Sequence, residues 1–133
     1  MRGILTFGAL AATTALWSAA CRSGGDQGAA DGVKAAITAA IQSQGDSITV
    51  TDPGTGQPVT LVFDHVHESV DATAGGRDVA CVDFHAADGR VFDVDYYVGR
   101  RDGKPEVQDY IVHKVDGREV IASTRRARLD STP

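Results

Sequence analysis

The stretch that decides the fold is VACVDFHAADGRVFDVDYYVGRRDGKPEVQDYIVHKVDG, which runs from Val79 to Gly117. It contains the dipeptide Asp-Gly at Asp88-Gly89, Asp102-Gly103 and Asp116-Gly117, each fourteen residues after the last. The runs between these dipeptides are rich in β-branched and aromatic residues, which favour strands. Because glycine accepts a positive φ at no steric cost and aspartate tolerates it, Asp-Gly between two such runs indicates a hairpin turn. The stretch therefore predicts an antiparallel β-meander.

The length of the first turn decides which side chains share a face of the meander. A two-residue loop at Asp88-Gly89 would place Asp93 and Asp95 beside the core, and an unpaired buried carboxylate costs several kcal/mol. A three-residue loop that begins one residue earlier instead sets Phe84 opposite Phe92. We choose the longer loop, which predicts an apolar face made of Ala80, Val82, Phe84, Phe92, Val94, Tyr96, Val98, Tyr110 and Val112.

The opposite face of the predicted meander is polar. If the second turn has the same length as the first, Asp95 lies opposite Asp109, and like charges at that distance repel unless histidine, arginine or a metal ion neutralises them. The side chains predicted on this face are Cys81, Asp83, His85, Asp93, Asp95, Tyr97, Asp109 and His113.

Upstream of the meander the pattern predicts one helix and one further hairpin. Apolar residues in Asp31 to Gly45 recur at helical spacing, with Asp31 as a possible cap and Gly45 as a stop. SITVTD and VTLVFDHVHESV, separated by the turn-rich PGTGQP, read as a hairpin. A polar loop, Asp71 to Asp78, leads into the meander. The predicted fold class is α+β, with one N-terminal helix packed on a single antiparallel meander of about five to six strands.

This order of elements, a helix followed by a meander that packs against it, resembles the cystatin-like architecture. The resemblance covers element order only. The Gln-x-Val-x-Gly motif of cystatin inhibitors is absent from the sequence, so the resemblance does not imply protease inhibition.

The N-terminus carries the parts of a secretory signal. Met1-Arg2 is a positive start, Gly3 to Trp17 is uncharged and mostly apolar, and small residues precede Cys21. The sequence SAAC resembles the lipobox of bacterial lipoproteins, although Ser18 stands where that family usually has leucine. The resemblance implies cleavage before Cys21, a diacylglycerol on its sulfur, and export to the periplasm or the cell exterior on a bacterial envelope membrane.

The expected organisation follows from this resemblance. Residues 1–20 are the signal peptide, 21–32 a flexible tether after the lipidated cysteine, 33–128 a single α+β domain and 129–133 a disordered tail. Two alternatives remain for the N-terminus, an uncut membrane anchor and a disulfide between Cys21 and Cys81.

Composition and motifs argue against several function classes. The net charge is −5 and basic residues are scattered, which is unlike a nucleic-acid-binding surface. The sequence has no Gly-x-Ser-x-Gly elbow, phosphate-binding loop or dinucleotide fingerprint. We expect no enzymatic activity and no cofactor. Cys81 is expected to be a small packing residue rather than a nucleophile, since neighbouring carboxylates raise the pKa of a thiol.

Two hypotheses for the function remain. The first is a noncatalytic envelope lipoprotein that contacts another protein or envelope material. The second is a domain that binds zinc or another transition metal, because imidazoles and carboxylates suit such ions and His65 and His67 alternate along one strand face. The candidate ligands are His65, His67, Asp83, His85, Asp93, Asp95 and His113.

Overall fold

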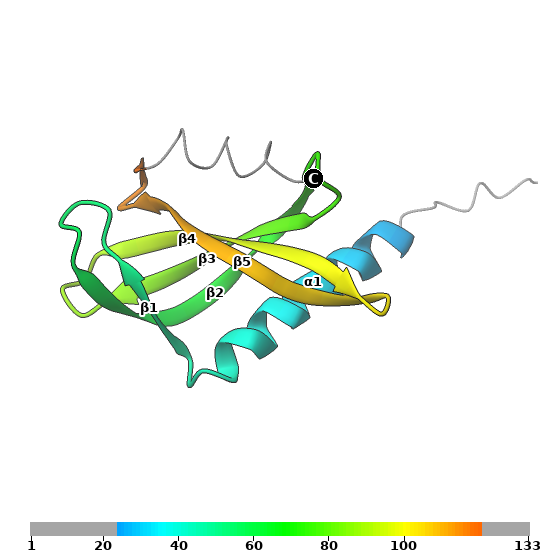
Figure 1. Cartoon of the computed structure of the whole chain (residues 1–133), viewed down its shortest axis with the longest axis horizontal. Coiled ribbons are helices and arrows are strands. Elements are labelled where there is room, and N and C mark those ends of the chain that lie inside the picture. The colour runs from blue at the N-terminus through cyan, green and yellow to red at the C-terminus, as the bar shows by residue number, and fades with distance from the viewer. Residues whose placement is uncertain (1–23, 121–133) are drawn as a thin grey trace, which may run out of the picture.

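The computed structural model describes residues 24–120, and it contains one helix and one six-stranded sheet (Figure 1). Every strand is antiparallel to the next, and the strands lie in the sheet in sequence order. This arrangement confirms the predicted α+β class. The elements are α1 (Gly24–Gln42), β1 (Ser47–Thr51), β2 (Pro58–Ala72), β3 (Asp78–Ala86), β4 (Val91–Arg101), β5 (Lys104–Val115) and β6 (Arg118–Glu119).

The helix α1 buries one narrow apolar stripe. Val33, Ile37 and Ile41 follow each other at intervals of four residues and are fully buried or nearly so. The helix ends before Gly45, which has a φ of 81°, as its sequence predicts.

The start of α1 differs from the prediction. The helix begins at Gly24 and not at Asp31, so residues 24–32 of the predicted tether are helical. Alanines at 29 and 30 favour the helix and Asp26 places a negative charge in the first turn, where the helix dipole favours it. The predicted signal peptide, Cys21 and the tail 129–133 lie outside the described residues.

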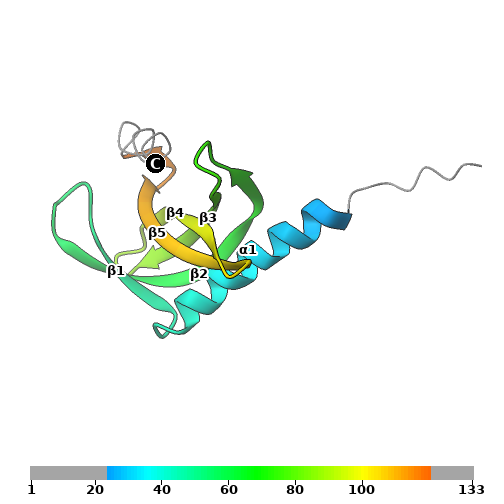
Figure 2. The ribbon, with the colours of Figure 1, turned by 45° about the vertical axis from the view of Figure 1, so that its right-hand side comes forward.

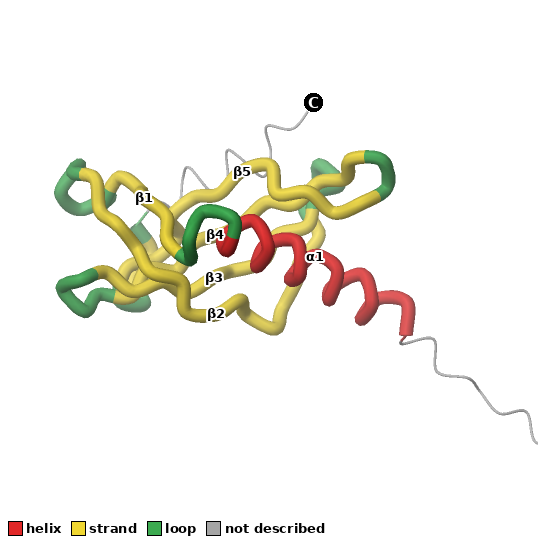
Figure 3. The backbone as a smooth tube through the Cα atoms, turned by 90° about the horizontal axis from the view of Figure 1, so that it is seen from below, coloured by secondary structure: helices red, strands yellow, loops and turns green. Residues whose placement is uncertain are grey.

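The sheet curves around α1 (Figures 2 and 3). In Figure 3 the helix lies over β3 and β4, with β5 along one side and β2 along the other. The buried core between the helix and the sheet contains Val33, Ile37, Ile41, Ile48, Val50, Leu61, Ala80, Val82, Phe84, Ala86, Phe92, Val94, Tyr96, Val98 and Val112. The predicted apolar face is thereby confirmed, with Tyr110 partly buried against this core.

The first turn of the meander has the predicted three residues. Phe84 pairs with Phe92, and the amide of Ala86 donates to the carbonyl of Arg90 at 3.0 Å. Gly89 adopts a φ of 87°, in the left-handed region expected for it. The acids of β4 therefore point away from α1.

The second turn is shorter than predicted, and this corrects the register of β5. Arg101 pairs with Lys104 across a two-residue loop in which Asp102 and Gly103 both have positive φ. Two register shifts in the β4–β5 pair leave Gln108 and His113 as extra residues on β5. As a result Asp95 pairs with Ile111, and Asp109 pairs with Tyr97. The prediction that Asp95 lies opposite Asp109 is therefore wrong.

Within residues 24–120, no helix combines the length and the apolar character needed to cross a membrane.

Candidate metal centre

The sheet surface that points away from α1, here called the outer face, carries a compact group of metal-ligand types. Cys81 on β3, Asp93 and Asp95 on β4, and His113 on β5 each offer one donor atom, and these four atoms all lie within 4.8 Å of one another. Asp95 is fully buried, and His113 and Asp93 are 4% and 9% exposed. We call these four residues the buried centre.

His113 reaches the buried centre because of a bulge. The register pairs Asp93 with Lys114 and Val94 with Val112, so His113 is the additional residue and lies with Lys114 against Asp93. The Nδ1 of His113 is 3.3 Å from Asp95 Oδ1. Its Nε2 is 3.2 Å from Glu119 Oε1 on β6, so a carboxylate orients each side of the imidazole ring.

Cys81 is a thiol held in its protonated form. Its Sγ donates a hydrogen bond to Asp95 Oδ1 at 3.0 Å, and among residues 24–120 it forms no disulfide bond. Burial, followed by the hydrogen bond and charge of Asp95 and the charge of Asp93, raises the pKa of the Cys81 thiol well above its ordinary value. The rise in pKa that we expected from the surrounding carboxylates is confirmed. A thiol of this kind is a poor nucleophile, and a cation is what would favour its thiolate.

Asp93 provides a separate observation. Its Oδ1 atom is buried and accepts no hydrogen bond within the described residues. A buried carboxylate oxygen without a partner is costly, since it has lost its hydration without a replacement. The same carboxylate supplies one donor atom to the group formed with Cys81, Asp95 and His113, so a bound cation is a partner that would compensate for the missing hydrogen bond.

A second group of ligand types lies on β2 and β3. A register shift between Phe63 and His65 brings both Asp64 and His65 to the outer face, and His65 pairs with Asp83. His67 follows on the same face, with its Nε2 2.9 Å from Asp83 Oδ1. One donor atom from each of His65, His67 and Asp83 lies within 4.8 Å of the others. We call these three residues the histidine cluster.

Asp64 positions the rings beside the histidine cluster. Its Oδ2 is 3.1 Å from His65 Nδ1 and 3.2 Å from His85 Nε2. Hydrogen bonds from His65 first and His85 second hold the pKa of Asp64 below its ordinary value. His85 is therefore bonded to Asp64 and is not part of either group of donors.

The structure thus divides the seven predicted ligands. Asp93, Asp95 and His113 come together in the buried centre, His65, His67 and Asp83 come together in the histidine cluster, and His85 stands apart. The sequence analysis did not assign Cys81 as a ligand. The available signal was its position opposite Asp95 in the register that the three-residue turn imposes.

Two other polar features have structural explanations. Asp52 is buried and accepts from Arg90 Nη1 at 2.7 Å and from the amide of Gly54 at 2.8 Å. Arg90 also bonds to Asp88 Oδ2 at 2.8 Å, so it joins the β1–β2 loop to the β3–β4 turn at one end of the molecule (Figure 1).

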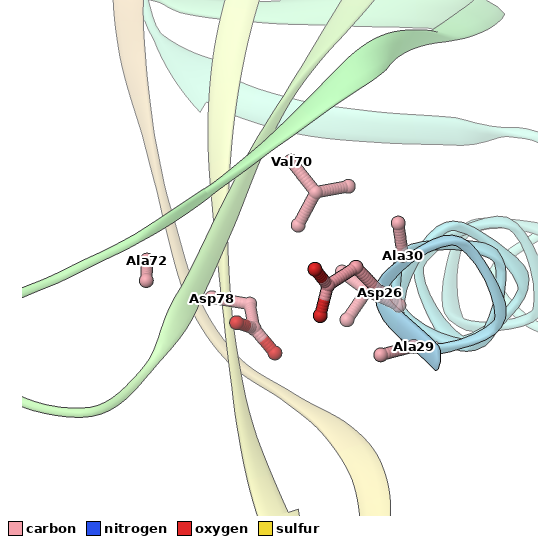
Figure 4. A pocket seen from close by; sticks show the side chains of 7 residues that line it. Asp26, Ala29, Ala30, Val70, Ala72 and Asp78 are labelled. Atoms are coloured by element: carbon pink, nitrogen blue, oxygen red, sulfur yellow. The ribbon is translucent and has the colours of Figure 1, made fainter. Parts of the chain in front are cut away.

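The pocket in Figure 4 lies between the first turns of α1 and the ends of β2 and β3, and has a volume of about 300 Å³. The carboxylates of Asp26 and Asp78 point into it beside Val70 and Ala30. Arg100 bonds to Asp78 at 3.1 Å, and Asp26 lies in the first helical turn. These contacts account for both charges without a ligand.

Comparisons with protein-family models, with curated proteins and with solved structures found no match to this chain. The fold and the site together define a small α+β domain with two groups of potential metal ligands on the outer face of its sheet.

Proposed function

We propose that the protein is a noncatalytic metal-binding domain that holds one transition metal ion, with zinc the best fit, in the buried centre. The observation that carries the proposal is the set of four donor atoms within 4.8 Å of one another, one of them from Asp93, whose buried Oδ1 accepts no hydrogen bond within the described residues. Thiolate, imidazole and carboxylate are the ligands that zinc takes in proteins, usually four at a time in a tetrahedron.

The charges of the buried centre suit a divalent ion. Binding would release the proton of Cys81, so the thiolate and the two carboxylates would carry three negative charges against two positive ones. Lys114, which pairs with Asp93, supplies a further positive charge beside the site. A closed set of four protein ligands leaves no position for substrate, and such closure is typical of structural rather than catalytic zinc.

Metal content of the purified full chain tests this proposal. After dialysis against metal-free buffer, we expect one zinc per chain in the wild type and none in Cys81→Ser. Asp109→Asn is a matched control, because it removes a carboxylate from the same strand pair outside both groups of donors. Circular dichroism verifies that each variant is folded. A folded wild type that retains no zinc, or a Cys81→Ser variant that retains all of it, would refute the proposal.

We further propose that this domain belongs to an exported lipoprotein anchored in a bacterial envelope membrane through Cys21, where it meets a protein or envelope partner. The support is the order of positive start, apolar run, small residues and cysteine at the N-terminus. Radiolabelled palmitate should enter the wild-type chain and not Cys21→Ala when both are expressed in a bacterium. Equal labelling of the two chains, or none of either, would contradict the anchor.

A further inference from the structure

The two groups of metal donors form one continuous row across the sheet. His65 on β2 pairs with Asp83 on β3, and Asp83 in turn pairs with Asp93 on β4. On β5 the bulge places His113 and Lys114 against Asp93. Residues that pair directly across strands have adjacent side chains, so Asp83 is a neighbour of both groups.

The two ends of this row differ in exposure. The side chains of His65 and His67 are 57% and 37% exposed, and that of Asp83 is 22% exposed. The buried centre at the other end contains Asp95 and His113, which are closed to solvent. Solvent exposure therefore decreases along the row, from the imidazoles on β2 to the bulge on β5.

The histidine cluster is arranged for binding an ion. The rings of His65 and His67 are stacked, with centroids 5.3 Å apart and planes within 19°. Asp64 bonds to Nδ1 of His65, which leaves Nε2 of this ring as the ligand atom, in the manner of carboxylates that orient metal-bound histidines. The Nε2 of His67 already faces Asp83 Oδ1, so an ion between them would replace the proton that now bridges them.

We propose that His65, His67 and Asp83 form a second, solvent-accessible metal site, which captures a hydrated divalent transition metal ion and passes it through Asp83 to the buried centre. The transfer step rests on the proposed function, whereas the second site stands without it. Three protein ligands leave positions for water on the ion, so the histidine cluster exchanges its metal readily. Four ligands including a thiolate make the buried centre the tighter site.

Zinc titration of the metal-free full chain against a chromophoric chelator tests the second site. We expect two zinc ions per chain in the wild type and one in His65→Asn/His67→Asn. His85→Asn is the matched control, because it removes a histidine of the same face that belongs to neither group. This variant should bind two ions. A wild type that binds one ion, lost in Cys81→Ser, overturns the second site and leaves the proposed function standing.

The converse result separates the two proposals. If Cys81→Ser binds as much zinc as the wild type while the double histidine variant loses one ion, the second site stands and the proposed function fails. Cobalt uptake tests the transfer step, because a thiolate-to-cobalt charge-transfer band reports only on the buried centre. We expect the band to appear several-fold more slowly in His65→Asn/His67→Asn than in His85→Asn. Equal rates in these two variants overturn the transfer step.

Discussion

Among individual side chains, Cys81 and its acidic neighbours have opposite electrostatic needs. Burial, Asp95 and Asp93 raise the pKa of the thiol and keep it protonated, while Oδ1 of Asp93 accepts no hydrogen bond within the described residues. One divalent cation satisfies both needs, because it lowers the pKa of the thiol and pairs with the carboxylate. Without the cation, the Cys81 thiol is expected to react slowly with electrophiles.

Alkylation of Cys81 measures this suppression in the Cys21→Ala background. In metal-free protein the iodoacetamide rate at pH 8 should lie well below that of an unstructured cysteine, whose pKa is about 8.5. Asp95→Asn removes a negative charge and a strong acceptor from the thiol, so it lowers the pKa of Cys81 and should raise the rate. A rate that is unchanged or lower in folded Asp95→Asn would contradict this account of the thiol.

Asp52 makes the stability of the folded state depend on pH. Hydrogen bonds from Arg90 first and Gly54 second hold the pKa of Asp52 below its ordinary value of about 3.9. The folded-state pKa is the lower one, so this stabilisation is complete above the unfolded-state pKa and disappears as pH falls through the folded-state pKa. Urea unfolding at pH 7 and at pH 3 should show a smaller loss of stability on acidification in Asp52→Asn than in the wild type. An equal loss in both proteins would exclude this contribution.

The elements differ in how far sequence patterns predict them. The first meander turn was predictable because its alternative would have buried carboxylates, an energetic penalty that residue types reveal. The second turn was predicted too long, because a two-residue loop keeps Asp109 away from the core only through the register shift that leaves Gln108 as an extra residue. The extra residues Gln108 and His113 have no sequence signature. The early start of α1 was missed because glycines at 24, 25 and 28 resemble a linker, while the alanines at 29 and 30 and the acidic Asp26 in the first turn favour the helix.

Two glycine substitutions probe the helix and the turn with the same added methyl group. Gly32→Ala in α1 should raise the free energy of unfolding by about 0.5–1 kcal/mol, since alanine is the better helix former. The new Cβ meets only Pro105, at an ordinary 3.7 Å. Gly89→Ala should lower the free energy of unfolding by about 1–2 kcal/mol, because its φ of 87° disfavours a Cβ. Urea unfolding compares the two, and effects of the same sign would contradict these backbone assignments.

For the molecule as a whole, the two faces of the sheet differ: one packs the apolar core and the other carries the proposed metal ligands. The concave face holds the apolar core around α1, while the outer face concentrates acids and histidines whose mutual repulsion and desolvation oppose folding. If the buried centre binds a metal ion as proposed, its occupancy would stabilise the entire domain and would thereby couple metal binding to folding. The histidine cluster, which is solvated, contributes little to this coupling.

Thermal unfolding with and without zinc measures this coupling. An ion that binds only the folded state stabilises it by about 2.7 kcal/mol when its free concentration is about 100 times Kd. We expect the Tm of the wild type to rise with zinc and to fall with a chelator. Cys81→Ser should show a much smaller rise than His65→Asn/His67→Asn. A larger rise in Tm for Cys81→Ser than for His65→Asn/His67→Asn would place the stabilising ion in the histidine cluster and contradict this prediction.

The early start of α1 has a consequence for how the domain would sit at a lipid surface. Cys21 precedes Gly24 by three residues, and a chain of this length spans at most about 11 Å. If Cys21 carried a lipid, the linker between the membrane and α1 would therefore be short, in place of the longer flexible tether expected from the sequence. Such a short linker would restrict the angle between the helix axis and the bilayer. It would thereby also restrict which envelope proteins the outer face can contact.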